Sequence, residues 1–177
     1  QAGQAIWWRT NAGRLAALDD HYGNRIHTLV ANSQTLDEEV PHTDLLIGAV
    51  LVAGAQAPKL VSRELVARME PGSVIVDVAV DQGGCVATIR PTTHDDPVYL
   101  AEGVLHYGVA NMPGAVSRTS TFALTTTTLP YVRLLAAAGF AACLDHPDLR
   151  IGVNVHAGDV THPAVAHALG LPHRTLP

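Results

Sequence analysis

Two long apolar segments without polar alternation constrain this chain more than any other feature. DLLIGAVLV begins at Asp44, and SVIVDVAV begins at Ser73. Continuous apolar runs of this kind are typical of parallel strands that helices cover on both faces. Pro58 and Ser62 open a helical segment between the two runs, with Ser62 as its N-cap. The result is a strand–helix–strand unit, which predicts an α/β fold.

Weaker patterns extend this unit in both directions. Two further strands are expected at 25–31 and 103–110, and helices are expected at 11–22, 35–40, 131–143 and 161–169. Four strands with helices or loops between them argue for a doubly wound, Rossmann-like parallel sheet. The sequence changes character near residue 115, because residues 119–128 are rich in hydroxyl groups and the following stretch is rich in alanine and leucine.

Composition excludes several classes of protein. The 177 residues are 47% hydrophobic and 15% charged, and the net charge of −5 provides no cationic surface for nucleic acid. No apolar run approaches the roughly 18 residues of a membrane span. The two cysteines suit a reducing compartment better than a disulfide scaffold, so a cytoplasmic protein is predicted. The ten histidines lack the spacing of zinc enzymes, so no metal site is expected.

Ligands of open parallel sheets bind beyond the carboxyl ends of the strands. Three loops rich in glycine or small residues fall there, and we expect them to converge on one crevice: 51–57, 81–85 and 111–115. Asp81 directly follows an apolar strand and precedes two glycines, so its carboxylate is a candidate to orient a substrate or tune a proton donor. The alternative is a turn aspartate that caps a backbone amide. Asp77, inside the strand, is expected to make a buried structural hydrogen bond.

The other candidates also leave two interpretations open. Asn111 and Met112 suit a ligand amide and a ring, or they form a strand-to-helix turn that ends at Pro113-Gly114. Arg90 reaches a phosphate or is an ordinary exposed loop arginine. The glycine fingerprint GxGxxG, which a dinucleotide-binding fold carries at its first strand–helix turn, does not occur in the sequence.

Three long segments resemble the alanine dehydrogenases: Thr43 to Cys85, RPTTHDDPVY from Arg90, and VANMPGAVSRTSTFAL from Val109. The resemblance extends from about Asn11 to Pro172. It implies NAD-dependent, reversible oxidative deamination of L-alanine to pyruvate and ammonia in a homo-oligomer, usually a hexamer. The related nucleotide-binding subunit of transhydrogenase tends to carry glutamate before QGG, so Asp81 favours the dehydrogenase.

The same resemblance assigns roles to individual residues. Asp81 corresponds to the active-site aspartate beside the nicotinamide. The positions that it implies for contact with NAD are Val50, Leu51, Val78, Asp81, Arg90, Val109, Asn111 and Met112.

The sequence also departs from the family. It matches only the C-terminal half, so we expect a partial NAD-binding domain at residues 1–115 and a helical segment of the substrate domain at 116–177. The first nucleotide-binding strand and the substrate-holding residues are not found in it. Arg9 stands where the family has an acidic residue for the ribose, after the second strand, and an arginine there favours a 2′-phosphate. The preceding AGQAIWW, with two adjacent tryptophans, does not resemble that apolar strand, so a disrupted or frameshifted start is the favoured interpretation.

These departures predict that the chain alone is inactive. The alanine- and leucine-rich faces after Pro113 are expected to form an exposed apolar surface, because their partner is the substrate domain. Two alternatives remain: a non-catalytic or split-enzyme subunit that pairs with a separate N-terminal half, and a transhydrogenase-like nucleotide-binding subunit.

Overall fold

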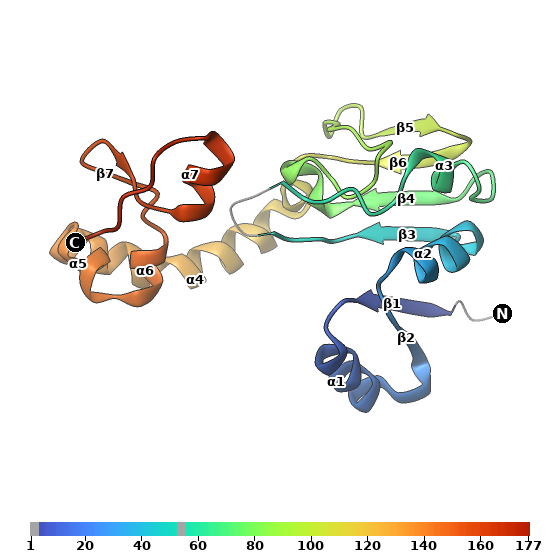
Figure 1. Cartoon of the computed structure of the whole chain (residues 1–177), viewed down its shortest axis with the longest axis horizontal. Coiled ribbons are helices and arrows are strands. Elements are labelled where there is room, and N and C mark those ends of the chain that lie inside the picture. The colour runs from blue at the N-terminus through green and yellow to red at the C-terminus, as the bar shows by residue number, and fades with distance from the viewer. Residues whose placement is uncertain (1–3, 53–55) are drawn as a thin grey trace.

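The computed structural model describes residues 4–52 and 56–177. Its first unit is a strand–helix–strand motif: β1 (Ala5–Arg9), α1 (Ala12–Tyr22) and β2 (Ile26–Val30). Asn11 caps α1 by accepting a hydrogen bond from the Arg14 backbone N–H at 3.0 Å. β1 and β2 are parallel and pair from Ala5 with Ile26 to Arg9 with Val30 (Figure 1).

The expectation that AGQAIWW forms no strand was wrong. Ala5–Arg9 alternates exposed and half-buried residues, and Trp8 packs against the main core. Tryptophan and isoleucine fit a half-buried pleated surface well, so the two adjacent tryptophans favour a strand at this position.

The second unit is a four-stranded sheet with the order β3-β4-β6-β5. Its strands are β3 (Leu45–Gly48), β4 (Val74–Asp77), β5 (Val98–Ala101) and β6 (Val104–Tyr107). β3, β4 and β6 are parallel, whereas β5 is an antiparallel edge strand that the sequence patterns did not indicate. The α/β fold with a mainly parallel sheet is therefore confirmed, with this one antiparallel addition.

The core lies on one face of this sheet. α2 (Ser33–Glu39) and α3 (Arg63–Val66) contribute Leu36, Leu65 and Val66, which pack against Leu46 and Ile75 of the sheet. Ser62 caps α3 as expected, since its hydroxyl accepts a hydrogen bond from the Leu65 N–H at 3.2 Å. The expectation that helices cover both faces of the apolar strands was wrong, because alternate residues of β3 are exposed on the opposite face.

Both apolar runs form shorter strands than predicted. β3 ends at Gly48, so Val50 and Leu51 belong to the following loop. β4 ends at Asp77, and residues Val78–Gln82 form a 3₁₀ turn. The Asp77 carboxylate accepts a hydrogen bond from the Ala79 N–H at 3.0 Å, which turns the backbone out of the strand.

The chain after residue 116 extends away from the sheet. Residues 119–128 belong to α4 (Ser117–Ala138), which runs through Pro130 and carries no buried residue. It leads to the C-terminal lobe, which we define as residues 139–177 (Figure 1). The elements of this lobe are α5 (Ala141–Asp145), α6 (Pro147–Ile151), β7 (Val155–His156), β8 (Asp159–Val160) and α7 (Pro163–Leu169).

The predicted exposed apolar surface on α4 is confirmed. Phe122, Leu124 and Leu129 are each more than half exposed. α4 begins two residues beyond the predicted boundary at 115, although the division into two domains stays a prediction. No helix within the described ranges is both long and apolar enough to span a membrane.

Candidate functional site

The carboxyl ends of the three parallel strands define the candidate site. β3 ends at Gly48, β4 at Asp77 and β6 at Tyr107. Figure 1 shows the loops that follow these strands on the side of the sheet where α4 begins. Residues 53–55 of the first predicted loop lie outside the described residues, whereas the other two loops are described in full.

Asp77 anchors the loop that carries Asp81. Its side chain is fully buried, and its Oδ2 accepts hydrogen bonds from the backbone N–H groups of Cys85 at 2.7 Å and Val86 at 3.0 Å. Oδ1 accepts the hydrogen bond from Ala79, and the Cys85 thiol lies 3.7 Å from the same atom. Asp77 thus holds both ends of the loop, and the predicted buried structural hydrogen bond is confirmed.

Two glycines make room for this anchor. A Cβ on Gly48 would lie 2.5 Å from the Cys85 Sγ and 3.2 Å from the Asp77 carboxyl carbon. A Cβ on Gly84 would lie 2.2 Å from Ile89 and 2.8 Å from the Asp77 Oδ2, and Gly84 also has a φ of +75°. Glycine is therefore required at both positions, at Gly84 for space and for its left-handed backbone.

Asp81 is exposed on the 3₁₀ turn that Asp77 starts. Gly83, with a φ of +88°, ends the turn, and its N–H donates to the Val80 carbonyl at 3.0 Å. Lys59 also stabilises this loop, since its ammonium group donates hydrogen bonds to the carbonyl oxygens of Gly83 and Val86. The Asp81 side chain is therefore exposed to solvent, and several hydrogen bonds fix the backbone of its loop.

Apolar side chains also follow the ends of β3 and β4. Leu51 is 77% exposed and Val78 is 51% exposed, while Val50 is half-buried and packs against the core. The first two loops are joined by a hydrogen bond from the Ala57 N–H to the Gln82 carbonyl at 2.9 Å. The loops after β3 and β4 therefore present exposed branched apolar side chains to solvent.

The third loop contributes the predicted polar and sulfur groups. Asn111 is exposed and has a left-handed backbone with a φ of +59°, while Met112 is half-buried at the start of a 3₁₀ turn. The Asn111 carbonyl lies 3.2 Å from the His94 Nε2. Val109 is fully buried beside Thr92, so its side chain does not reach the surface of the site.

Arg90 has a partner within the chain. Its guanidinium carbon lies 4.1 Å from the centre of the Tyr99 ring, and its backbone N–H donates to the Tyr99 hydroxyl at 2.8 Å. Tyr99 in turn donates its hydroxyl proton to the Thr88 carbonyl at 2.9 Å. An arginine that stacks on an aromatic ring is oriented before any ligand arrives.

The strand ends thus present both apolar and polar side chains. Leu51 and Val78 are exposed apolar side chains, Met112 is half-buried, and Asp81 and Asn111 are exposed polar side chains. The buried Gln82 Oε1 has no hydrogen-bond partner in the part of the chain that the structure describes. The sequence contains no GxGxxG turn, which is the phosphate-binding motif of dinucleotide-binding folds.

The Cys85 thiol is electrostatically coupled to Asp77. Burial raises the pKa of Cys85, and together with the charge and the hydrogen bond of the neighbouring Asp77 carboxylate it brings this pKa from 9.0 to about 11. Since the thiolate is the reactive form, Cys85 is expected to be inert. We predict that iodoacetamide at pH 8 modifies the half-buried Cys143 first and modifies Cys85 only after unfolding.

This pKa also predicts a pH dependence of stability. Between pH 9 and 11 the folded chain keeps the Cys85 proton and the unfolded chain loses it, so the free energy of unfolding falls as the pH rises through this window. Between pH 8 and pH 10.5 the loss should be about 2 kcal/mol. Urea unfolding at pH 8 and pH 10.5 measures it, and the Cys85→Ala variant is the control. An equal pH dependence in both proteins would contradict the assignment.

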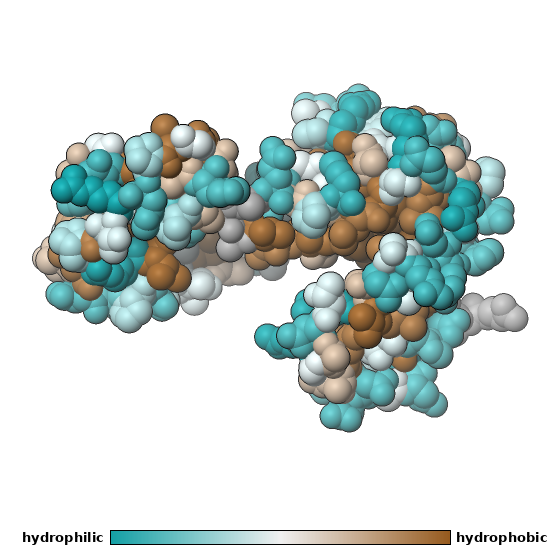
Figure 2. Space-filling view, in the orientation of Figure 1, coloured by the Kyte–Doolittle hydropathy of each residue, from teal (hydrophilic) through white to brown (hydrophobic). Residues whose placement is uncertain are grey.

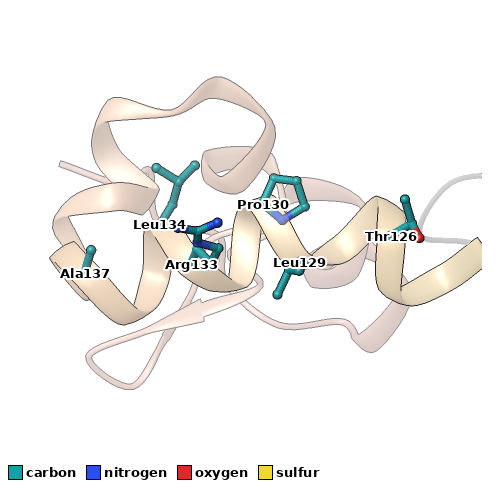
Figure 3. Close-up of a pocket in the computed structure, with 6 residues that line it drawn as sticks. All are labelled: Thr126, Leu129, Pro130, Arg133, Leu134 and Ala137. Carbon is teal, nitrogen blue, oxygen red and sulfur yellow. The ribbon is translucent and has the colours of Figure 1, made fainter. Parts of the chain in front are cut away.

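A separate hollow lies on α4, away from the strand ends. All six residues that line it belong to this one helix (Figure 3): Thr126, Leu129, Pro130, Arg133, Leu134 and Ala137. Since no second element contributes a lining residue, we interpret it as part of the exposed face of α4. None of the predicted site residues lies in it.

Two residues of the site were missed in the sequence analysis. Lys59 is the single lysine beside ten arginines, and a lone lysine close to the glycine-containing loops was a usable signal. Tyr99 gave no such signal, because its contact with Arg90 depends on β5, which the sequence patterns did not predict. The expected roles of Asp81 and the other candidates stay predictions.

Comparison with known proteins places this geometry in a family. Residues 6–163 match the family model "Alanine dehydrogenase/PNT, C-terminal domain". The chain is 55% identical over 162 residues to alanine dehydrogenase of Lysinibacillus sphaericus, covering 90% of this chain and 44% of the relative. It is 55% identical over 165 residues to alanine dehydrogenase of Methanococcus maripaludis, with coverages of 92% and 44%. The chain therefore spans less than half the length of these relatives.

Solved structures agree with the sequence comparison. A structure of L-alanine dehydrogenase superposes with a TM-score of 0.83 at 49% identity, covering 95% of this chain and 46% of the other. A transhydrogenase from Sinorhizobium meliloti superposes with a TM-score of 0.63 at 19% identity, covering 78% and 47%, which shows a shared fold alone. The family model, the sequence identity to alanine dehydrogenases and the structural superposition agree. This chain belongs to the alanine dehydrogenase/PNT family and carries its C-terminal domain.

Proposed function

We propose that this chain is the nicotinamide-binding part of an alanine dehydrogenase. The reaction is the NAD-dependent, reversible oxidative deamination of L-alanine to pyruvate and ammonia, in a cytoplasmic homo-oligomer, as the resemblance to the family implies. The observation that supports it most is Asp81, an exposed carboxylate at the carboxyl end of the middle parallel strand, in a chain 55% identical to alanine dehydrogenases.

In this proposal each loop has a defined task. Val50, Leu51, Val78 and Met112 line the nicotinamide ring, and the Asn111 amide bonds to its carboxamide. Bound NAD supplies a hydride acceptor. The Asp81 carboxylate accepts a hydrogen bond from the substrate amine and holds the reacting carbon in register with the ring, which is the positioning that catalysis requires.

The remaining predicted contacts concern the rest of the cofactor. Arg90, oriented by Tyr99, faces the negative charge of the pyrophosphate, and the backbone at Val109 borders the crevice. Arg9 ends β1, where an acidic residue would bind the ribose of NAD and an arginine favours a 2′-phosphate. Measuring the Kd of NAD and the Kd of NADP for the Arg9→Asp variant tests which of the two cofactors Arg9 favours.

The proposal predicts that residues 1–177 alone do not oxidise L-alanine. NADH absorbance should stay flat with L-alanine and NAD, because the sequence supplies no phosphate-binding turn. A chimera in which these residues replace the matched part of the Lysinibacillus sphaericus enzyme should oxidise L-alanine. A chimera that melts cooperatively but produces no NADH would contradict the proposal, as would clear turnover by the chain alone.

A further inference from the structure

Asn111 has a backbone conformation that its place in the fold does not by itself require. Three non-glycine residues in the described ranges have a left-handed backbone, namely Glu102, Asn111 and Ala157. Glu102 and Ala157 each precede a glycine in a two-residue turn between antiparallel strands, where the turn calls for a positive φ. Asn111 lies in no such hairpin, because it follows β6 and precedes a 3₁₀ turn. A non-glycine residue keeps this conformation only where its surroundings fix it, and such residues gather at functional sites.

The segment that carries His94 runs parallel to the segment that carries Asn111. The Thr92 N–H donates to the Gly108 carbonyl at 2.8 Å, and the Ala110 N–H donates to the Thr92 carbonyl at 3.2 Å, so the two segments form a parallel bridge. His94 lies two residues beyond this bridge on one segment, and Asn111 lies two residues beyond it on the other. Parallel register therefore places the two residues side by side.

The turn that carries His94 is held by its own hydrogen bonds. Thr92 is buried, and its hydroxyl donates to the Pro97 carbonyl at 3.0 Å. The Asp96 N–H donates to the Thr93 hydroxyl oxygen at 3.3 Å. Hydrogen bonds on both sides thus fix the backbone from which the exposed His94 ring extends.

The Asn111 carbonyl has two donors within hydrogen-bond distance. The Gly114 N–H donates to it at 2.9 Å, and the His94 Nε2 lies 3.2 Å from it. A carbonyl oxygen can only accept, so the hydrogen of the neutral imidazole lies on Nε2. Gly114 leaves room for this arrangement, because a Cβ there would lie 3.1 Å from the His94 Nε2 and 3.3 Å from the Asn111 Nδ2.

Apolar side chains are exposed after each of the three parallel strands. Leu51, Val78 and Val116 are all more than half exposed, and Figure 2 shows hydrophobic surface that extends from the sheet toward α4. A mainly apolar binding site depends on a few placed polar groups to orient its ligand. The Asn111 amide is such a group, and its direction depends on the backbone that His94 contacts.

We propose that His94 is a positioning residue of the candidate site. Its imidazole N–H holds the Asn111 carbonyl, fixes the left-handed backbone there, and so directs the Asn111 amide and the Met112 side chain toward the cofactor ring. His94 acts through Asn111 and takes no part in proton transfer. The inference rests on the proposed function, because the ring that these groups meet is the nicotinamide.

Kinetics of the chimera with the Lysinibacillus sphaericus enzyme test this role. His94→Ala should raise the KM for NAD by about three- to tenfold, the effect of losing one hydrogen bond, and should change the KM for L-alanine by less than about twofold. His94→Gln should keep the KM for NAD within about twofold of the unmodified value, because the glutamine Nε2 donates from the same number of bonds away from the backbone.

His173→Ala is the matched control. The His173 Nε2 also lies 3.2 Å from a backbone carbonyl, that of Thr161, at an exposed position of the C-terminal lobe. This variant should keep both KM values. An equal KM for NAD in His94→Ala and His173→Ala would overturn the proposal. A His94→Gln variant that behaves like His94→Ala, while all variants melt like the unmodified chimera, would overturn it too.

Amide exchange in residues 1–177, followed by NMR, tests the contact without any turnover. The Gly114 N–H shares the Asn111 carbonyl with His94, so its exchange should be about threefold or more faster in His94→Ala and nearly unchanged in His94→Gln. Unchanged exchange at Gly114 in His94→Ala would contradict the positioning role. An unmodified chimera that produces no NADH would instead contradict the proposed function, so the two failures are distinguishable.

Discussion

Replacing Asp77 by alanine should lower the free energy of unfolding of the sheet by about 3–5 kcal/mol. The carboxylate accepts three backbone hydrogen bonds in a fully buried position, from Ala79, Cys85 and Val86. Its removal leaves three buried N–H groups without their acceptor, and each such group costs about 1–3 kcal/mol. Charged acceptors make stronger hydrogen bonds than neutral ones, which places the expected loss above that of an ordinary buried polar group.

Urea unfolding followed by tryptophan fluorescence measures this loss. Trp7 and Trp8 both lie in β1, and Trp8 packs against the core of the sheet. The Asp77→Asn variant is a milder version that keeps the volume and one acceptor oxygen. Asp81→Asn is the matched control, because Asp81 is exposed and the change should cost less than about 0.5 kcal/mol. Equal stabilities of the Asp77 and Asp81 variants would contradict the anchoring role.

For catalytic activity we expect the reverse order: substitution of Asp81 should have the larger effect and substitution of Asp77 the smaller. In the chimera with the Lysinibacillus sphaericus enzyme, Asp81→Asn should lower kcat for L-alanine by about 10²–10⁴-fold. The amide keeps the shape of the side chain and loses the charge, so substrate binding changes less than turnover. Asp77→Asn should affect kcat mainly through the fraction of folded protein.

Steady-state kinetics and a melting curve on the same preparations separate these effects. Asp95→Asn alters another exposed aspartate, in the turn that follows Thr93, and should leave kcat unchanged. A kcat for Asp81→Asn within about threefold of the unmodified chimera would remove this residue from the proposed mechanism.

The local part of the site was predictable from the sequence. The position of Asp81 after an apolar strand, the buried hydrogen bonds of Asp77 and the cap at Ser62 all depend on residues within about ten positions of each other. The strand that ends at Asp77 was predicted too long because Val78 and Val80 continue the apolar pattern. Hydrophobic runs cannot distinguish a strand from the 3₁₀ turn that a side-chain hydrogen bond produces.

Features that depend on distant residues were not predictable in this way. β5 exists because it pairs with β6, and its short VYLA sequence carries no independent strand signal. The contact of Lys59 with Gly83 and Val86 joins residues that lie 24 and 27 positions apart. The strand at Ala5–Arg9 was missed because expectations from the family outweighed the β preference of its tryptophans and isoleucine.

α4 has a consequence for the thermodynamics of the whole chain. Its 22 residues bury no side chain, and Pro130 interrupts its hydrogen bonding. Thr125, Thr127 and Thr128 also direct their hydroxyls to carbonyls of the preceding turn, which weakens a helix slightly. Among the described residues, the buried cluster of the sheet includes none from the C-terminal lobe, whose own buried residues include Ala142 and Ala166.

We therefore expect the sheet and the C-terminal lobe to unfold as separate cooperative units, since α4 buries none of its own side chains and so couples their free energies weakly. A substitution at Asp77 should then lower the stability of one unit and leave the other unchanged. Thermal unfolding should show two transitions rather than one.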